Sequence, residues 1–191
     1  MELKNNERID DLEFENLKII QNTDGFCFGI DSVLLSDFAK NIKRNSKVVD
    51  IGTGTGIISI LLSKKANVNK IYGVEIQEEV ADMAKRSVEL NNLEDKIEII
   101  NEDIKNIGKY LENNTIDVIV SNPPYKKVSA GIKNENEKLL ISRHEIKCNL
   151  ADIAEISRKL LKDKGEIYIV HKSERLVDII TTFRQYNLEV K

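Results

Sequence analysis

The sequence predicts an α/β fold built on a doubly wound, mainly parallel sheet. Three observations lead to this prediction. Short runs rich in Val and Ile alternate with segments of helical periodicity, which is typical of βαβ units. A glycine-rich turn directly follows the first of these runs. The length of 191 residues, 41% of them hydrophobic, suits one domain with a substantial core.

Each expected strand is a short β-branched run, because strands covered on both faces read as continuous hydrophobic segments. The five runs are residues 47–51, 71–75, 97–100, 116–120 and 166–170. Apolar residues at helical spacing predict crossover helices over 57–66 and 77–91. A further helix is expected from an Asn149 cap to residue 162, with Gly165 breaking it. Shorter helices are expected to begin at Asp31 or Ser32 and at Ser173.

We expect residues 1–191 to form one domain, with an N-terminal segment and helix over 1–45 and the sheet core over 46–191. The connection between the last two strands is about twice as long as the others, which predicts an insertion over 126–148 on the substrate side. Residues 188–191 resemble the start of another strand. We therefore expect a sheet that lacks its last C-terminal strand or strands, with an exposed apolar edge beside residues 166–170.

Composition excludes several classes of protein. The 29 Lys and Arg against 32 Asp and Glu give a net charge of −3, so the chain has no global basic field for wrapping nucleic acid. No run of 18 apolar residues and no signal peptide is evident, which predicts a cytoplasmic protein without a membrane partner. Cys27 and Cys148 are too few for a disulfide scaffold, and no Cys/His cluster has metal spacing.

The strongest ligand-binding signal near the start of the core is the turn from Asp50 to Gly56. Gly52, Gly54 and Gly56 alternate there between a buried strand and a helix. Glycine in such a turn lets a ligand approach the backbone closely. The third glycine of the dinucleotide pattern would fall at Ile57, which makes an NAD site less favoured than another ligand. A purely structural turn is the alternative.

Two further carboxylates stand at strand ends. Glu75 ends the second expected strand, where it can accept hydrogen bonds from both hydroxyls of a ribose; alternatively it begins a helix. Asp103 follows the third strand and can accept from an adenine amino group; alternatively it is a loop or N-cap aspartate. Together they predict a nucleoside ligand.

The segment Asn122-Pro123-Pro124-Tyr125 follows the fourth expected strand directly. Two adjacent prolines fix the backbone and end the strand, so the turn projects Asn122 and Tyr125 stiffly from the sheet edge. An ordinary strand terminator is the alternative. In open α/β sheets ligands lie outside the carboxyl ends of strands at the switch point, here between the first and fourth strands. We therefore expect this turn and the glycine turn to face one crevice.

At these residues the chain resembles the class I S-adenosylmethionine-dependent methyltransferases, in which the glycine turn (50–56) holds the cofactor and Asn122 to Tyr125 is the amino-methylating signature. The resemblance covers nearly the whole chain and implies a Rossmann-like sheet. Within the class, residues 25–32 and 142–145 resemble bacterial enzymes that methylate adenine N6 in valine tRNA.

The resemblance implies S-adenosylmethionine as cofactor, no metal, and roles for individual residues. The cofactor would be bound by Phe28, Asp50, Gly52, Thr53, Gly54, Gly56, Glu75, Ile76, Asp103, Ile104 and Asn122. The catalytic turn would be Asn122, Pro123, Pro124 and Tyr125. Substrate contacts would come from Tyr125, Lys126, Lys127 and Arg143. Lys126 departs from the family pattern, because an aromatic residue stands there in many relatives.

Local charge favours RNA as the partner, and the resemblance implies that this RNA is a tRNA. Residues 126–147 hold six basic and three acidic side chains, whereas residues 1–24 hold three basic and seven acidic ones. Alternatives remain open: methylation of guanine N2 or cytosine N4, protein glutamine N5-methylation of the release-factor type, a non-catalytic nucleotide-binding module that docks RNA, and a dehydrogenase. The sequence does not determine the oligomeric state.

Overall fold

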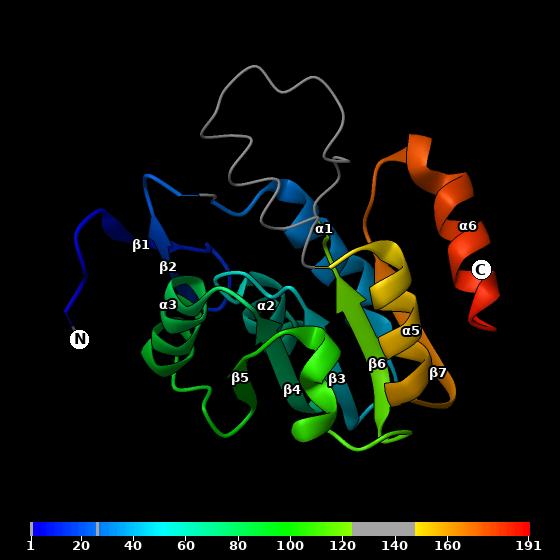
Figure 1. Cartoon of the computed structure of the whole chain (residues 1–191). Helices are drawn as coiled ribbons and strands as arrows, with labels where there is room; N and C mark the ends of the chain where they lie inside the picture. Colours follow the sequence, from blue (N-terminus) through cyan, green and yellow to red (C-terminus); the bar gives the residue numbers. More distant parts are fainter. Residues whose placement is uncertain (1, 26, 124–147) are drawn as a thin grey trace.

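The computed structural model describes residues 2–25, 27–123 and 148–191. Its main feature is a five-stranded, fully parallel sheet with the strand order β5-β4-β3-β6-β7 (Figure 1). The strands are β3 (Ser46–Ile51), β4 (Val68–Glu75), β5 (Ile97–Asn101), β6 (Ile116–Ser121) and β7 (Leu161–Ile169). The chain winds outward from β3 to β5, then crosses back to β6 on the other side of β3. The doubly wound sheet expected from the sequence is confirmed.

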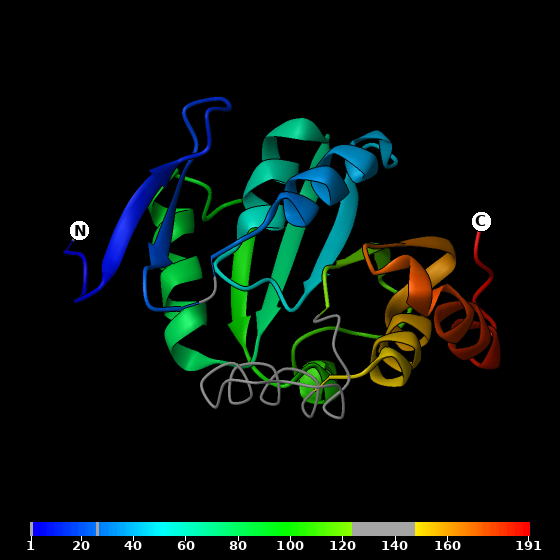
Figure 2. The ribbon, with the colours of Figure 1, turned by 90° about the horizontal axis from the view of Figure 1, so that it is seen from above.

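Helices cover both faces of the sheet (Figure 2). One face carries α1 (Ile30–Phe38), α2 (Ile57–Lys65) and α3 (Glu78–Leu90); the other carries the 3₁₀ helix η2 (Ile104–Lys109), α5 (Leu150–Leu160) and α6 (Leu176–Gln185). Short 3₁₀ turns, η1 (Ala39–Asn41) and η3 (Ser173–Arg175), adjoin α1 and α6. The arrangement places two apolar layers against one sheet.

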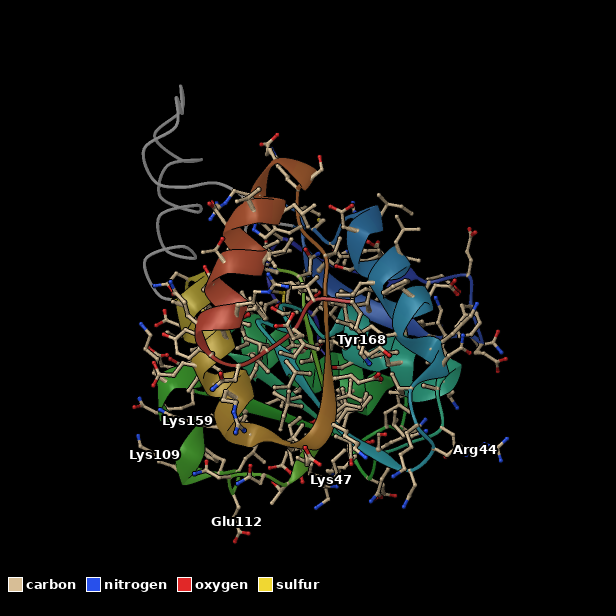
Figure 3. The ribbon with its side chains drawn as sticks, turned by 90° about the vertical axis from the view of Figure 1, so that its right-hand side faces the viewer. Arg44, Lys47, Lys109, Glu112, Lys159 and Tyr168 are labelled. Atoms are coloured by element: carbon tan, nitrogen blue, oxygen red, sulfur yellow. The ribbon has the colours of Figure 1, made fainter. Side chains whose placement is uncertain are left out.

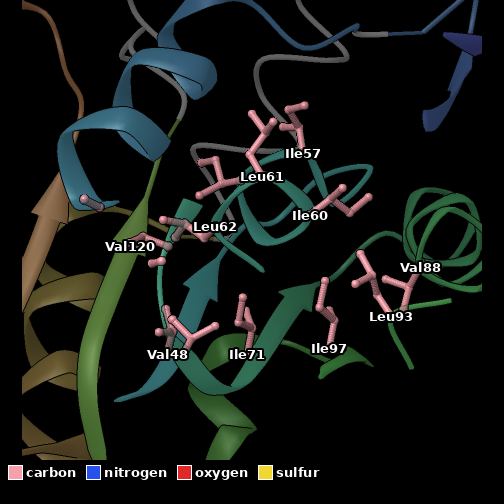
Figure 4. Packing of buried hydrophobic residues seen from close by; sticks show 14 of the residues in the cluster. Val48, Ile57, Ile60, Leu61, Leu62, Ile71, Val88, Leu93, Ile97 and Val120 are labelled. Atoms are coloured by element: carbon pink, nitrogen blue, oxygen red, sulfur yellow. The ribbon is translucent and has the colours of Figure 1, made fainter. Parts of the chain in front are cut away.

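Alternation along the strands divides the core in two. Val48 on β3 belongs to the cluster beneath α2, whereas its neighbour Val49 belongs to the cluster beneath α5. Figure 4 shows Val48 and Ile71 on the strands, facing Leu62 of α2. Each fully buried side chain of this kind contributes roughly 1.5–3 kcal/mol to folding. Burial on both faces explains why the strands are nearly continuous in Val and Ile.

An antiparallel hairpin of β1 (Glu7–Asp11) and β2 (Lys18–Asn22) precedes the sheet, and the sequence analysis did not predict it. The hairpin packs on α3 rather than on the sheet. Glu7 and Arg86 form two hydrogen bonds of 2.6 and 2.7 Å, and the Ile20 backbone N–H donates to Ser87 Oγ. Both strands are short and contain few apolar residues, so the sequence pattern did not mark them as strands.

The elements near the C-terminus differ most from expectation. Helix α5 has the predicted Asn149 cap, but it ends at Leu160, and β7 begins directly at Leu161. Gly165 therefore lies inside β7, where the pairing with β6 shifts register and an added Cβ would stand 2.8 Å from Leu161 Cδ2. Ser173 does not cap the last helix, because a 3₁₀ turn precedes α6.

β7 is one of the two edge strands of the described sheet, and residues 188–191 form no strand beside it. Figure 3 looks onto this edge, with Tyr168 on β7 between α6 and α1. The ring of Tyr168 meets Phe38 of α1 edge to face at 5.9 Å, and Phe38 is 76% exposed. The described residues thus hold no further strand beside β7, as expected for a sheet without its last C-terminal strand, and apolar surface lies at this edge.

The ion pair between Glu7 and Arg86 ties the hairpin to α3, and its side chains are only 5% and 13% exposed. Arg86→Ala would leave the Glu7 carboxylate without its guanidinium, so we expect a loss of about 2 kcal/mol in the free energy of unfolding. Urea titration measures this loss. Lys40→Ala removes an exposed ion pair with Asp37 and should cost less than about 1 kcal/mol. Equal losses in the two variants would contradict the anchoring role.

Candidate functional site

The two sequence motifs meet at the carboxyl ends of β3 and β6. Ile51, the last residue of β3, pairs in register with Ser121, the last residue of β6. The Ser121 hydroxyl donates a 2.9 Å hydrogen bond to the Ile51 carbonyl and so joins the two strand ends. Gly52 and Asn122 each follow directly, so the glycine turn and the start of the proline turn are neighbours. The expected juxtaposition of the two turns is confirmed for the residues described.

The glycine turn has a backbone that only glycine adopts readily. Gly52, Gly54 and Gly56 have φ of 70°, 59° and 93°, in the left-handed region. A Cβ on Gly52 or Gly54 would meet nothing within 4 Å, whereas one on Gly56 would touch Ile60 and Ala84. The first two glycines therefore border open space, and the third packs helix α2 against α3. Close approach of a ligand is possible at Gly52 and Gly54.

Asp50 lies under this turn, fully buried at the end of β3. Its Oδ2 accepts hydrogen bonds from Thr53 Oγ1 at 2.7 Å and from Ser59 Oγ at 2.8 Å. These contacts connect the strand, the turn and the first turns of α2. Oδ1 has no hydrogen-bond partner among the described residues. Asp50 thus shapes the turn from below and keeps one carboxylate oxygen unsatisfied.

Burial raises the pKa of Asp50 to about 6, and the negative charge of Glu75 acts in the same direction. The hydroxyls of Thr53 and Ser59 oppose this rise, because they donate to the charged form. A carboxyl whose pKa lies this close to neutral pH is typical of functional sites.

Glu75 ends β4 and is 3% exposed. Its carboxylate accepts from the backbone N–H of Gly54 at 3.1 Å and of Gln77 at 2.9 Å. The side chain therefore fixes the glycine turn against the start of α3. The helix-start role raised as the alternative is thus present, since Glu75 stands just before α3 and accepts from Gln77. Whether it also holds a ribose stays a prediction.

Asp103 and its neighbours lie at the end of β5. Asp103 caps η2, with its Oδ1 accepting from the Lys105 backbone N–H at 2.9 Å. Ile104 is 5% exposed and belongs to the core beneath α5. Ile76 is half-buried directly after β4. The N-cap role raised as the alternative is thus present, and adenine binding by Asp103 remains a prediction.

Asn122 and Pro123 are the described part of the proline turn. Pro123 is buried and Asn122 half-buried. The Asn122 side-chain amide donates a 2.9 Å hydrogen bond from Nδ2 to the hydroxyl of Ser32 on α1. Pro124, Tyr125, Lys126, Lys127 and Arg143 lie outside the described residues, as do residues 126–147 of the expected insertion. Their predicted roles therefore stay predictions.

Phe28 lies in a different setting from the one its predicted cofactor role suggests. It lines a cavity of about 360 Å³ together with Phe14 from the hairpin and with Leu61 and Lys65 from α2. Its backbone N–H donates to Gln21 Oε1 at 2.9 Å. Phe28 thus joins the hairpin to the helical layer, and a cofactor contact stays a prediction.

Three residues of the site escaped the sequence reasoning as site residues. Ser59 lies in α2 and Ser32 in α1, and each of these helices also holds a second serine, so residue type alone did not mark either position as part of the site. Gly73 in β4 leaves room for the turn, because a Cβ there would stand 3.1 Å from Thr53 and 2.8 Å from Ile99 Cδ1. The sequence signal for the role of Gly73 was a glycine inside a strand, which often marks a close approach of another backbone.

Neither a metal site nor a membrane span emerges from the part of the chain that the structure describes. No group of three or more His, Cys, Asp or Glu side chains there could hold a metal ion. No described helix is both long and apolar enough to cross a bilayer.

Comparison with known proteins gives a consistent result over most of the chain. The model of the methyltransferase small domain matches residues 17–188. The tRNA1(Val) (adenine(37)-N6)-methyltransferase of Trichodesmium erythraeum is 29% identical over 93% of this chain and 76% of its own length; that of Porphyromonas gingivalis is 28% identical over 94% and 71%. The crystal structure of M. jannaschii TYW2 in complex with AdoMet has a TM-score of 0.57 at 17% identity, over 85% of this chain and 62% of its own, and so shares the fold.

The raised pKa of Asp50 predicts a pH-dependent stability. Well below pH 4 the carboxyl is protonated in both states; between about pH 4 and 6 the unfolded chain ionises while the folded chain keeps its proton, so stability falls by up to about 3 kcal/mol and levels off above pH 6. Asp50→Asn has no such charge, so its free energy of unfolding relative to the wild type should rise between pH 4 and 7. Urea unfolding across this range measures the difference.

Asp117→Asn is the control for this experiment. Burial acts to raise the pKa of Asp117, but hydrogen bonds from Lys162 and the Lys47 backbone outweigh it and hold the pKa below its usual value. The charged form of Asp117 therefore stabilises the fold above about pH 4. The stability of Asp117→Asn relative to the wild type should not rise between pH 4 and 7. If the difference in free energy of unfolding between Asp50→Asn and the wild type did not change with pH, the raised pKa of the buried Asp50 carboxyl would be contradicted.

Proposed function

The chain belongs to the methyltransferase small domain family, and from this premise we propose that it transfers a methyl group from S-adenosylmethionine to an exocyclic amino group of a nucleic acid base, most directly adenine N6 of a tRNA. The observation that carries this proposal is the pairing of Ile51 with Ser121, which makes Asn122-Pro123 the neighbour of the glycine turn. The relatives named as tRNA1(Val) adenine-N6 methyltransferases support the choice of base and RNA.

The residues of the glycine turn fit the cofactor. Gly52 and Gly54 leave open space where a side chain would otherwise stand, so an extended ligand can lie along the backbone. The unsatisfied Oδ1 of Asp50 and the carboxylate of Glu75 put negative charge beside this space. A cofactor that carries a sulfonium and an ammonium group is favoured by such surroundings.

S-Adenosylmethionine supplies a methyl group on a positively charged sulfur, which an amine nitrogen can take in one in-line displacement. An exocyclic amine is a poor nucleophile, because its lone pair is delocalised into the ring. The carbonyl oxygens of Asn122 and Pro123 can each accept one N–H of that amine, which orients the nitrogen and favours a tetrahedral geometry. Orientation of this kind can lower the activation barrier by several kcal/mol, out of the roughly 7–11 kcal/mol that good positioning of two reactants can supply.

The reaction balances without a general base. The N–C bond forms as the S–C bond breaks, and the methylated nitrogen, now ammonium-like and acidic, releases its proton to water. The scheme uses no histidine; His171, just after β7, accepts a 2.9 Å hydrogen bond at Nδ1 from the Lys172 backbone N–H. Under this proposal Tyr125 stacks on the base, with Lys126, Lys127 and Arg143 contacting the RNA backbone. The same proposal places the enzyme in the cytoplasm with tRNA.

A survey of acceptors tests the substrate. The full chain is incubated with labelled S-adenosylmethionine and, separately, with bulk tRNA, ribosomal RNA and a protein extract. We expect label in tRNA, recovered as N6-methyladenosine after digestion. Label confined to protein glutamine would refute the RNA substrate. It would instead support the release-factor type of reaction, in which the same turn would hold the planar side-chain amide of a glutamine.

Asn122→Ala tests the catalytic turn. Loss of one carbonyl acceptor should lower kcat by about 100-fold, by analogy with removal of a single positioned hydrogen-bond partner, while cofactor affinity by calorimetry changes little. Asn67→Ala is the matched control, because Asn67 is exposed and precedes β4 at the opposite edge of the sheet. Unchanged turnover in Asn122→Ala would remove the catalytic role, and absence of cofactor binding in the wild type would refute the proposed function.

A further inference from the structure

Helix α1 places a serine against the catalytic turn. The buried residues of this helix are Ser32, Leu35 and Ser36, which lie on one face, whereas Ile30, Leu34 and Phe38 are exposed. Leu35 packs in the apolar cluster, and Ser36 accepts a 3.0 Å hydrogen bond from Lys65 on α2. The burial of Leu35 holds the helix at a fixed depth. Ser32, one turn earlier, is therefore held at the carboxyl end of β6.

Ser32 is 5% exposed, and its hydroxyl accepts the hydrogen bond from Asn122 Nδ2. The pair spans 90 positions in sequence, so it depends wholly on the tertiary fold. A side-chain amide is planar, and its nitrogen and oxygen point away from each other. Holding the nitrogen on Ser32 therefore also determines the direction of the Oδ1 acceptor.

The terminal torsion of asparagine is otherwise broad and nearly two-fold, so an unrestrained amide can exchange its oxygen and nitrogen. An exchanged amide would present N–H donors to the N–H groups of an exocyclic amine. Such a pairing repels, and it removes one of the two acceptors that orient the nucleophile. A restraint on the Asn122 amide thus acts on the reaction itself rather than on the fold.

We propose that Ser32 is a positioning residue for methyl transfer, and that its hydroxyl keeps the Asn122 amide in the orientation in which Oδ1 accepts from the substrate amine. This inference rests on the proposed function, because it gives Ser32 a role through Asn122. Ser32 touches neither methyl donor nor substrate in this scheme. Its effect is expected on turnover and not on cofactor binding.

Ser32→Ala in the full chain tests the proposal. We expect kcat to fall about tenfold, which corresponds to about 1.4 kcal/mol, with KM for S-adenosylmethionine and the melting temperature little changed. Ser32→Thr keeps the hydroxyl and should restore turnover. In the Asn122→Ala background the Ser32→Ala change should add nothing, because the two residues act as one unit.

Ser36→Ala is the matched control, since it removes a buried hydroxyl from the same face of α1, one turn away, without touching Asn122. A second readout needs no substrate: the side-chain amide signals of Asn122 in ¹⁵N-labelled protein, identified by their loss in Asn122→Gln. These signals should move in Ser32→Ala and stay in place in Ser36→Ala.

Two results would overturn the proposal. One is an unmoved Asn122 amide signal in Ser32→Ala; the other is a moved signal with turnover equal to that of the wild type or of Ser36→Ala. These outcomes are distinct from failure of the proposed function. If the acceptor survey labels protein instead of RNA, turnover is measured on that acceptor, and the amide signal still reports on the hydrogen bond.

Discussion

The pairing of β3 with β6 is the constraint on which the rest of this site depends. Strands 65 residues or more apart in sequence are brought edge to edge, and the register Ile51 with Ser121 ends both at the same level. The bond from Ser121 Oγ to the Ile51 carbonyl holds the two ends together. Because each strand continues into a turn that cannot extend the ladder, the two turns begin side by side at the same edge of the sheet.

Around that pairing, hydrogen bonds from buried polar groups connect the neighbouring elements. Asp50 links the glycine turn to α2, Glu75 links it to the start of α3, and Ser32 links α1 to Asn122. Each of these groups would be costly to bury without partners, so each strongly favours one backbone arrangement. The unsatisfied oxygen of Asp50 is the exception, and it lies beneath the part of the turn that borders open space.

The membership of the chain in a methyltransferase family and the geometry at the ends of β3 and β6 support the proposed chemistry by independent routes. The family match concerns residues 17–188 as a whole. The geometry concerns a few atoms: two glycines beside open space, and an amide with its nitrogen held by Ser32. Under the proposed function, carbonyl acceptors beside the glycine turn would orient an amine, and such orientation can supply part of the rate enhancement.

The sequence alone determined the parallel sheet, the position of the glycine turn and the nature of the proline turn, because β-branched runs, glycine spacing and paired prolines act through local backbone chemistry. It did not reveal the hairpin, the start of β7 or the roles of Ser32, Ser59 and Gly73. Those were decided only by the tertiary structure. A serine in a helix has no local signature, and its hydrogen bond to Asn122 exists because two distant segments meet across the sheet.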